Sequence, residues 1–334
     1  MFMAQATKYS NNKIIICTDF DKDLKLYRIP HELKSKLKKY KNIKIINFDY
    51  SNPECKKAEI YWGNLIDDKR IKFLSNLKWI HLGCVGCDKI KNLKILDRIK
   101  LTNSARIMSS SVAESIFTFV FVFLRRFDRC IHLKNKKLLN RKNFDVYFEE
   151  VRNIKDCKFL IFGGGNISKI FISKLRYFSK NIDLVSSVSF QNKFVKNYSF
   201  KNFKRKKLNY DFVISILPEK IKYNNYFNVK FFKKMNKSSF FINVGRGSAV
   251  NEKDLIKCLS NNVIAGAGLD VFKNEPINHL NPLYKLDNCL VTPHIAGLFN
   301  NYWKAQSDLF FFNLKMFILN KKLKNIVKIE NLYG

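Results

Sequence analysis

The 334-residue sequence predicts an α/β fold with two doubly wound parallel sheets, one in each of two domains. Short apolar runs alternate with helical patterns along the chain, which is typical of parallel βαβ units. The length favours two domains over one. Glycine is scarce, with 12 residues, and most glycines stand at the ends of apolar runs, where a missing Cβ lets the backbone approach another group closely.

The first alternating series occupies the first hundred residues. We expect a helix at 31–40 and strands at 13–19, 43–49, 58–64 and 77–83. A longer helix is expected over 109–127, because serines that can cap it precede the apolar run and arginines close it.

The second series follows the same pattern. We expect a helix at about 167–178 and strands at 157–162, 182–188, 211–217, 239–245, 263–272 and 289–294. The tail over 297–320 is predicted to be a helix that packs back onto the first domain. The predicted domains are therefore 1–103 plus 291–334, and 104–290.

The charge is strongly positive, because 62 lysines and arginines outnumber 27 acids and give a formal charge of +35. Such a charge is typical of proteins that bind nucleic acid or anionic membranes. The lysines are scattered along the whole chain, however, and the densest run, 201–207, has no stacking aromatic pattern around it. We therefore interpret the charge as compositional drift and expect no nucleic-acid partner.

The sequence also predicts a cytoplasmic protein. The N-terminal residues lack the apolar run of a secretory signal, and the apolar stretch 116–124 is too short to span a bilayer. The eight cysteines resemble small buried side chains of a reducing compartment. Cys84 and Cys87 form a lone CxxC, which leaves a redox pair open, and we expect no metal site and no membrane partner.

The segment FGGGNISKIF (162–171) resembles the glycine fingerprint of a dinucleotide site, since it follows an apolar strand and opens a helix. Gly163 permits the tight turn, and Gly165 lets the backbone approach a pyrophosphate at the helix N-terminus. Ser168 stands at the third glycine position, where close helix–strand packing, rather than phosphate contact, sets the requirement. The pattern favours a cofactor site over a simple turn.

The end of the next strand indicates which dinucleotide binds. An NAD site is expected to carry an acid there for the ribose 2′-hydroxyl, but SSVSFQNKFVK (186–196) has no Asp or Glu. Ser186, Ser187, Lys193 and Lys196 could accept a 2′-phosphate instead. The sequence therefore favours NADP(H), with NAD(H) possible.

Three further strands each deliver one ionisable residue to the same sheet edge, namely Arg246, Glu275 and His294. An arginine can hold a carboxylate in a forked geometry. A histidine can give or take the proton of a carbonyl/alcohol pair. A glutamate beside it favours the protonated ring and fixes its orientation. Together the three residues predict a redox site.

The segments INVGRG (242–247), LDVFKNEP (269–276) and TPHIAG (292–297) resemble the signatures of the D-isomer-specific 2-hydroxyacid dehydrogenases, in the same order and spacing. The resemblance runs over roughly 58–320. It implies a flavodoxin-like substrate domain, a Rossmann cofactor domain, a homodimer, and a catalytic triad of Arg246, Glu275 and His294.

The resemblance also implies roles for other residues. Asp270 would contact the nicotinamide amide, and the backbone of the loop 82–88, at Val85 and Gly86, would grip the substrate carboxylate together with Arg246. Trp62 falls in the region that lines the substrate pocket. The implied cofactor site comprises Gly163, Gly165, Asn166, Ile167, Ser186, Ser187, Leu217, Pro218, Val244, Gly245 and Asp270.

Within that family, FLRRFDR (123–129) and the acid-free strand end are similar to NADPH-dependent glyoxylate/hydroxypyruvate reductases. Two alternatives stay open at this point. One is an NAD-dependent dehydrogenase of 3-phosphoglycerate or another D-2-hydroxy acid. The other is a non-catalytic protein that senses a dinucleotide.

Overall fold

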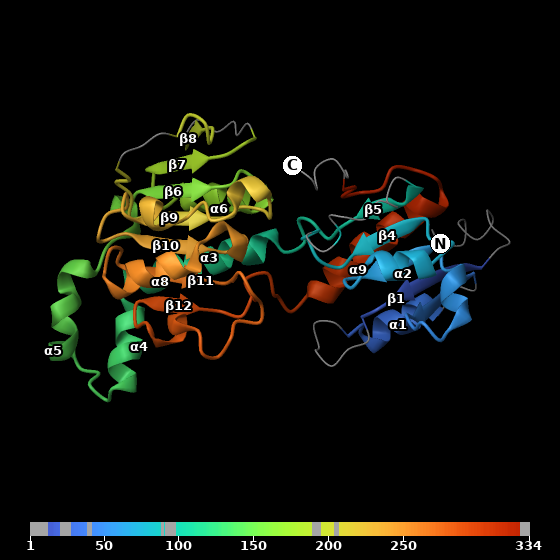
Figure 1. The fold of residues 1–334 in the computed structure, drawn as a ribbon, viewed down its shortest axis with the longest axis horizontal. Coiled ribbons are helices and arrows are strands. Elements are labelled where there is room, and N and C mark those ends of the chain that lie inside the picture. Colours follow the sequence, from blue (N-terminus) through green and yellow to red (C-terminus); the bar gives the residue numbers. More distant parts are fainter. Residues whose placement is uncertain are drawn as a thin grey trace. The chain divides into compact units, whose positions relative to one another are not determined.

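The computed structural model describes residues 13–20, 28–38, 42–87, 90, 98–188, 195–203 and 207–327. The chain divides into two compact units, Met1–Met108 with Phe299–Gly334, and Ser109–Leu298. Each unit is built on one parallel sheet (Figure 1), so the predicted α/β class is confirmed.

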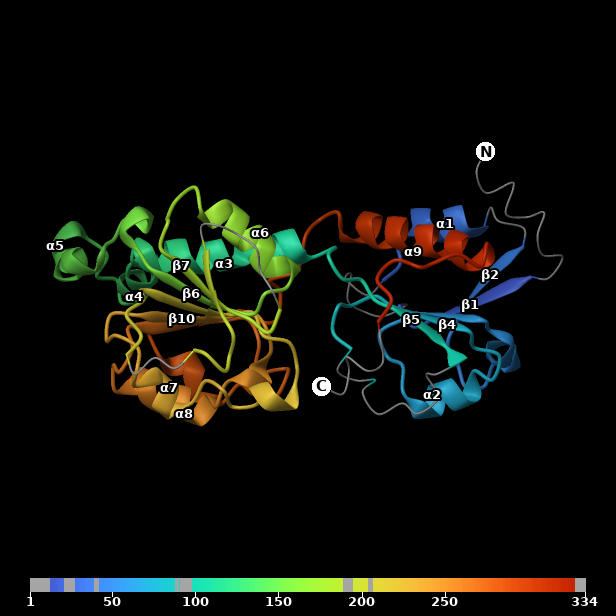
Figure 2. The same cartoon turned by 90° about the horizontal axis from the view of Figure 1, so that it is seen from above.

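The sheet of the first unit has the order β2-β1-β3-β4-β5, and every pair is parallel. This is the flavodoxin-like order 2-1-3-4-5. Helices α1 and α9 cover one face and α2 the other (Figure 2). The bounds are β1 Ile14–Thr18, α1 His31–Lys38, β2 Ile43–Asn47, β3 Ile60–Gly63, α2 Asp68–Phe73, β4 Trp79–Leu82, β5 Lys100–Thr102 and α9 Tyr302–Ile318.

The C-terminal helix α9 packs onto this sheet, as predicted. Phe310 and Leu314 of α9 are fully buried in one cluster with side chains of β1, β3 and β4. The ring of Phe310 stacks on Trp62 with their centroids 3.9 Å apart. Trp62 is therefore packed in the core of the first unit, and its place in the region of the substrate pocket, which the resemblance implies, stays a prediction.

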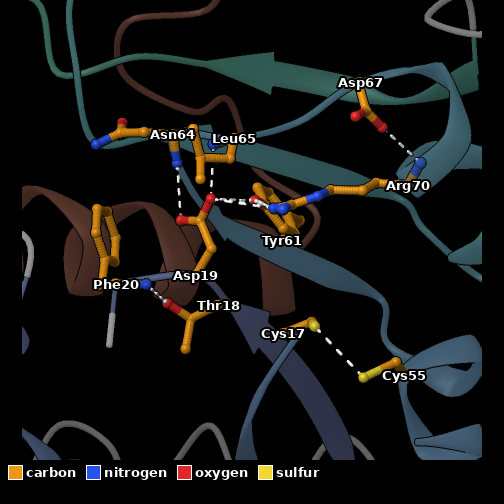
Figure 3. A network of polar contacts seen from close by, with 10 residues as sticks. All are labelled: Cys17, Thr18, Asp19, Phe20, Cys55, Tyr61, Asn64, Leu65, Asp67 and Arg70. Atoms are coloured by element: carbon orange, nitrogen blue, oxygen red, sulfur yellow. Dashed lines mark hydrogen bonds and ion pairs between the residues drawn. The ribbon is translucent and has the colours of Figure 1, made fainter. Parts of the chain in front are cut away.

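A network around Asp19 ties the end of β1 to the loop after β3 (Figure 3). The Asp19 carboxylate accepts hydrogen bonds from the Tyr61 hydroxyl at 2.7 Å and from the backbone N–H groups of Asn64 at 3.0 Å and Leu65 at 2.6 Å. Arg70 completes the network with an ion pair of 3.3 Å to Asp19. A carboxylate with this many donors holds the loop by charge-assisted hydrogen bonds.

His81 lies in the core of the first unit. Its Nδ1 is 2.7 Å from the Thr102 hydroxyl, and burial lowers the pKa of the imidazole to about 3. The ring is therefore neutral in the folded protein at pH 7.

The pH dependence of stability should report this burial. An unfolded histidine with a pKa near 6.5 takes up a proton as the pH falls, whereas folded His81 does not. The free energy of unfolding that His81 contributes is therefore present above pH 6.5 and is lost as the pH falls below it. Between pH 7.5 and 5 the loss is about 2 kcal/mol. Denaturant titrations of the wild type and of His81→Gln at both pH values measure it. Equal slopes with pH in both proteins would show that His81 is not the cause.

The sheet of the second unit has the order β12-β11-β10-β9-β6-β7-β8, again entirely parallel. The strand sequence reverses beside β6, so β6 and β9 flank a topological switch point, where ligands bind in open α/β sheets. The bounds are β6 Phe159–Phe162, β7 Ile182–Val185, β8 Val195–Tyr198, β9 Phe212–Ser215, β10 Phe240–Asn243, β11 Gly266–Leu269 and β12 Cys289–Val291.

Helices α3 and α6 cover one face of this sheet, and α7 and α8 cover the other (Figure 2). The predicted helix over 109–127 ends earlier, because Arg126 adopts a left-handed conformation with φ 53° and a new helix, α4, begins at Phe127. The bounds are α3 Ser109–Leu124, α4 Phe127–Asn135, α5 Arg141–Phe144, α6 Asn166–Leu175, α7 Val229–Phe232 and α8 Glu252–Ser260.

The units divide after residues 108 and 298, later than the predicted 103 and 290. The physical reason at the second boundary is that β12 and the loop after it bond to β11 and its continuation. The Thr292 N–H donates to the Leu269 carbonyl at 2.9 Å, and the His294 N–H donates to the Asp270 carbonyl at 2.9 Å. His294 therefore belongs to the second unit.

Candidate active site

The three predicted catalytic residues follow neighbouring strands of one parallel sheet. Arg246 follows β10, Glu275 follows β11, and His294 follows β12, and these strands are adjacent in the order β12-β11-β10. Because parallel strands end at the same edge, all three residues belong to the carboxyl edge of the sheet, where α/β proteins bind ligands.

His294 and Glu275 form a direct pair. The imidazole Nδ1 lies 2.6 Å from Glu275 Oε2, and the other carboxylate oxygen, Oε1, accepts the Phe272 N–H at 2.9 Å. A carboxylate accepts only, so Nδ1 carries the proton of this bond. Nε2 is left without a partner in the described part of the chain, and 51% of the side chain is exposed. The pair thus presents one ring nitrogen to solvent in a fixed orientation.

Asp270 supports the loop that carries His294. Its buried carboxylate accepts the Thr292 hydroxyl at 2.6 Å and the N–H groups of Ile295 at 2.8 Å and Ala296 at 3.0 Å. These bonds hold the loop while His294 takes a left-handed backbone conformation, with φ 55°. Its expected nicotinamide contact stays a prediction, but this supporting role was missed. The signal available in the sequence was an aspartate directly after an apolar run.

The turn around Arg246 is packed too tightly to hold any side chain at its glycines. A Cβ on Gly245 would lie 2.6 Å from the Leu217 backbone, and one on Gly247 would lie 1.9 Å from the Phe272 carbonyl carbon. Phe272 in turn binds the Glu275 carboxylate. The half-buried Arg246 donates from Nη1 to the Gly245 carbonyl at 2.8 Å. Close backbone packing therefore links the arginine turn to the glutamate.

The glycine segment has the shape that a pyrophosphate needs. Gly163 has φ 108°, and a Cβ there would lie 2.7 Å from the Ile216 carbonyl oxygen at the end of β9. Gly165 begins α6 without a side-chain cap, and a Cβ there would meet nothing within 4 Å. The first N–H groups of α6, those of Asn166 and Ile167, thus stand open at a positive helix end beside the switch point, which fits the phosphates of a dinucleotide.

Ser168 explains how the segment tolerates the missing third glycine. It is fully buried, and its hydroxyl donates to the Gly163 carbonyl at 2.5 Å. The side chain closes the turn on the protein side, so Ser168 serves packing, as expected from the sequence.

The residues predicted to accept a 2′-phosphate differ in their exposure to solvent. Ser186 is buried and its hydroxyl is shared with the backbone of Val188, at 3.0 Å, so Ser186 faces inward. Ser187 is exposed, and its hydroxyl lies 2.9 Å from the Tyr223 hydroxyl. Lys196 is exposed on β8, and Lys193 lies outside the described residues. Of the remaining cofactor candidates, Leu217 and Val244 are buried and Pro218 is exposed.

The loop after β4 carries two adjacent backbone donors, the N–H groups of Val85 and Gly86. The carbonyl groups of Leu82, Gly83, Cys84, Val85 and Gly86 each accept a hydrogen bond. The N–H groups of Val85 and Gly86 have no partner within the described ranges, and the Val85 side chain is 41% exposed. Adjacent free backbone donors suit an anion such as a carboxylate.

The two cysteines of the CxxC segment bond to the backbone of their own loop. The thiol of Cys84 bonds to the Gly86 carbonyl at 3.2 Å and that of Cys87 to the Val85 carbonyl at 3.8 Å, within the same loop. Among the residues that the structure describes, no group of three or more His, Cys, Asp or Glu side chains could hold a metal ion. A search of the same residues finds no helix long and apolar enough to cross a membrane.

A parallel sheet with an open helix N-terminus at its switch point and a histidine–carboxylate pair at the same edge defines a dinucleotide-dependent oxidoreductase. Residues 118–296 match the NAD binding domain of the D-isomer specific 2-hydroxyacid dehydrogenases, and the chain belongs to this family. Its cofactor is accordingly a nicotinamide dinucleotide.

Relatives of known name agree with this assignment. The chain is 28% identical over 238 residues to a probable 2-ketogluconate reductase of Dictyostelium discoideum, covering 69% of this chain and 70% of that protein. It is 27% identical over 279 residues to the glyoxylate/hydroxypyruvate reductase HPR3 of Arabidopsis thaliana, covering 82% and 84%. An NADPH-dependent glyoxylate/hydroxypyruvate reductase of Sinorhizobium meliloti shares the fold with a TM-score of 0.78 at 22% identity, over 96% and 100% of the chains.

Proposed function

We propose that this dehydrogenase reduces a small 2-oxo acid, glyoxylate or hydroxypyruvate, with NADPH. The observation that carries the proposal is the His294–Glu275 pair, 2.6 Å apart, at the strand edge that also bears Arg246. That combination supplies a proton donor and a cation for a substrate that carries a carbonyl and a carboxylate.

Each residue has one task in the proposed reaction. The bound nicotinamide supplies the hydride. His294 gives the proton of Nε2 to the carbonyl oxygen of the substrate, while Glu275 holds Nδ1 and stabilises the charged ring. Arg246 binds the substrate carboxylate. The N–H groups of Val85 and Gly86, which bond to no other described residue, are further donors of the kind that a carboxylate requires.

The preference for NADPH rests on the strand end after β7. No Asp or Glu occurs in 186–196 to take a ribose 2′-hydroxyl. Exposed Ser187 and Lys196 are suited to a 2′-phosphate. Solved relatives include enzymes bound to NADP or NADPH and one bound to NAD, so the family accommodates both dinucleotides.

The test is a matrix of two cofactors and four substrates. Consumption of NADPH and NADH is followed with glyoxylate, hydroxypyruvate, pyruvate and phosphohydroxypyruvate, and kcat/KM is compared across all pairs. We expect the highest values for NADPH with glyoxylate or hydroxypyruvate. A preference for NADH with phosphohydroxypyruvate would replace the proposal by the phosphoglycerate alternative, and no turnover of any pair would favour a dinucleotide-sensing protein.

A further inference from the structure

We propose that four side chains, Asn103, Ser104, Tyr302 and Gln306, act as positioning residues for the substrate loop 82–86. We call them the loop clamp. The inference rests on the proposed function, because it takes the N–H groups of Val85 and Gly86 as carboxylate donors. Two members come from the segment after β5 and two from α9, about 200 residues later in the chain.

The first part of the clamp acts on the peptide groups that carry the two donors. In a trans peptide the C=O of one residue and the N–H of the next lie in one plane and point in opposite directions. The Cys84 carbonyl accepts the Ser104 N–H at 3.1 Å, which fixes the plane of the Val85 N–H. The Val85 carbonyl accepts Asn103 Nδ2 at 2.8 Å, which fixes the plane of the Gly86 N–H.

The second part, from α9, fixes the backbone just before these planes. The buried Tyr302 hydroxyl donates to the Gly83 carbonyl at 2.8 Å. This bond holds the peptide that carries the Cys84 N–H, so the loop cannot rotate as a whole about its first residues. Gly83 itself leaves no room for a side chain, since a Cβ would lie 2.4 Å from the Phe20 ring.

Gln306 acts through Ser104. The Ser104 hydroxyl lies 2.7 Å from both the Leu82 carbonyl and Gln306 Oε1, but it has one proton to donate. A 180° turn of the carboxamide, which exchanges its O and N, lets Gln306 donate to Ser104 Oγ and Ser104 donate to Leu82. It also gives a partner to Gln306 Nε2, which otherwise has none among the described residues although it is buried. Each hydrogen bond of the chain Gln306–Ser104–Leu82 then has one donor and one acceptor, and the carboxamide oxygen takes the buried position that has no partner among the described residues.

The test compares variants that remove clamp hydrogen bonds with one that removes hydrogen bonds made elsewhere by α9. Tyr302→Phe deletes the bond to the Gly83 carbonyl. Asn103→Ala deletes the bond to the Val85 carbonyl together with those to the Cys87 thiol and the Ala105 N–H. Asn313→Ala is the matched control, because buried Asn313 bonds to both backbone groups of Lys324, at 2.7 and 3.1 Å, and not to the loop. Steady-state constants, the unfolding midpoint and the Kd of NADPH are measured for each.

We expect the clamp variants to raise KM for the 2-oxo acid roughly tenfold, with kcat changed less than about threefold and the Kd of NADPH unchanged. Asn313→Ala should lower the unfolding midpoint at least as much without raising KM. An unchanged KM in both clamp variants, or an equal rise in Asn313→Ala, would overturn the inference.

A second measurement separates this inference from the proposed function. Oxalate, a small dicarboxylate, is titrated onto the NADP⁺-bound protein, which requires no turnover. Weaker oxalate binding in the clamp variants than in the wild type supports the clamp even if no 2-oxo acid is reduced. If wild-type protein binds no oxalate, or if the clamp variants bind it as tightly as wild type, the loop clamp is wrong.

Discussion

Replacing His294 with alanine is expected to lower kcat by roughly 10²- to 10⁴-fold while leaving the Kd of NADPH nearly unchanged. The reason is that Nε2 of His294 is the proton donor held in place by Glu275, at 2.6 Å, with no alternative acid in the pair. A tenfold loss in rate corresponds to about 1.4 kcal/mol of barrier, so the expected loss raises the barrier by about 3–5 kcal/mol. Single-turnover and steady-state NADPH oxidation with the preferred 2-oxo acid measure it.

His132→Ala is the matched control for that experiment. His132 also pairs with a carboxylate in the second unit, since its Nδ1 lies 2.9 Å from Asp287 Oδ1. Asp287 precedes β12, however, whereas His294 follows it, so the two pairs lie at opposite edges of the parallel sheet. His132→Ala should therefore keep wild-type turnover. Near-normal reduction of 2-oxo acids by His294→Ala would remove His294 from the chemistry.

Glu275→Gln tests the carboxylate separately from the imidazole. In the native structure His294 Nδ1 and the Phe272 N–H bond to different carboxylate oxygens, Oε2 and Oε1. The amide has a single acceptor oxygen, so it can keep only one of the two bonds, and it cannot stabilise a charged ring as a carboxylate does. The kcat of this variant should fall between those of wild type and His294→Ala, because the imidazole is kept as proton donor while its charged partner is lost.

Most strands of the second sheet could be predicted because they are apolar runs with largely buried side chains. Phe159–Phe162 and Phe240–Asn243, for example, contain only buried residues. Two strands escaped prediction. Lys100–Thr102 is three residues long, and Val195–Tyr198 is an edge strand with exposed polar side chains, so neither shows the apolar pattern of a central strand.

The residues of the candidate site could also be predicted only in part. Arg246, Glu275 and His294 could be found because each follows an apolar strand, and strand ends share one edge. The contacts that support the catalytic residues and the substrate loop could not be predicted, because they join residues that are far apart in the sequence. Nothing local in the sequence pairs Tyr302 with the Gly83 carbonyl, 219 positions away.

Trp62 shows that a resemblance alone does not indicate the packing around a residue. It stands on a strand whose four residues are all buried, and α9 covers it with Phe310. An apolar residue in the middle of a central strand is more often packed by the next layer than open to a ligand. The contacts of Ser186 were likewise not visible in the sequence, since its hydroxyl turns back to the Val188 backbone.

The second large effect is expected from a pair of glycine substitutions that separate the catalytic edge from the cofactor turn. In Gly247→Ala the new Cβ would lie 1.9 Å from the Phe272 carbonyl carbon, so the turn or Phe272 must shift. Overpacking of this kind costs about 1–3 kcal/mol of stability. Because Phe272 binds Glu275, which holds His294, we also expect kcat to fall at least tenfold. Denaturant unfolding and steady-state kinetics measure both losses.

Gly165→Ala should weaken cofactor binding without lowering stability. Gly165 has φ −76°, which alanine adopts readily, and its Cβ would meet no protein atom within 4 Å, so stability should stay equal or rise by up to about 1 kcal/mol. The same methyl group would occupy the space through which the pyrophosphate approaches the N-terminus of α6, so the Kd of NADPH should rise at least tenfold. Fluorescence titration of NADPH measures this affinity. Loss of stability in Gly165→Ala with unchanged NADPH binding would show that the open face of this turn is not the cofactor site.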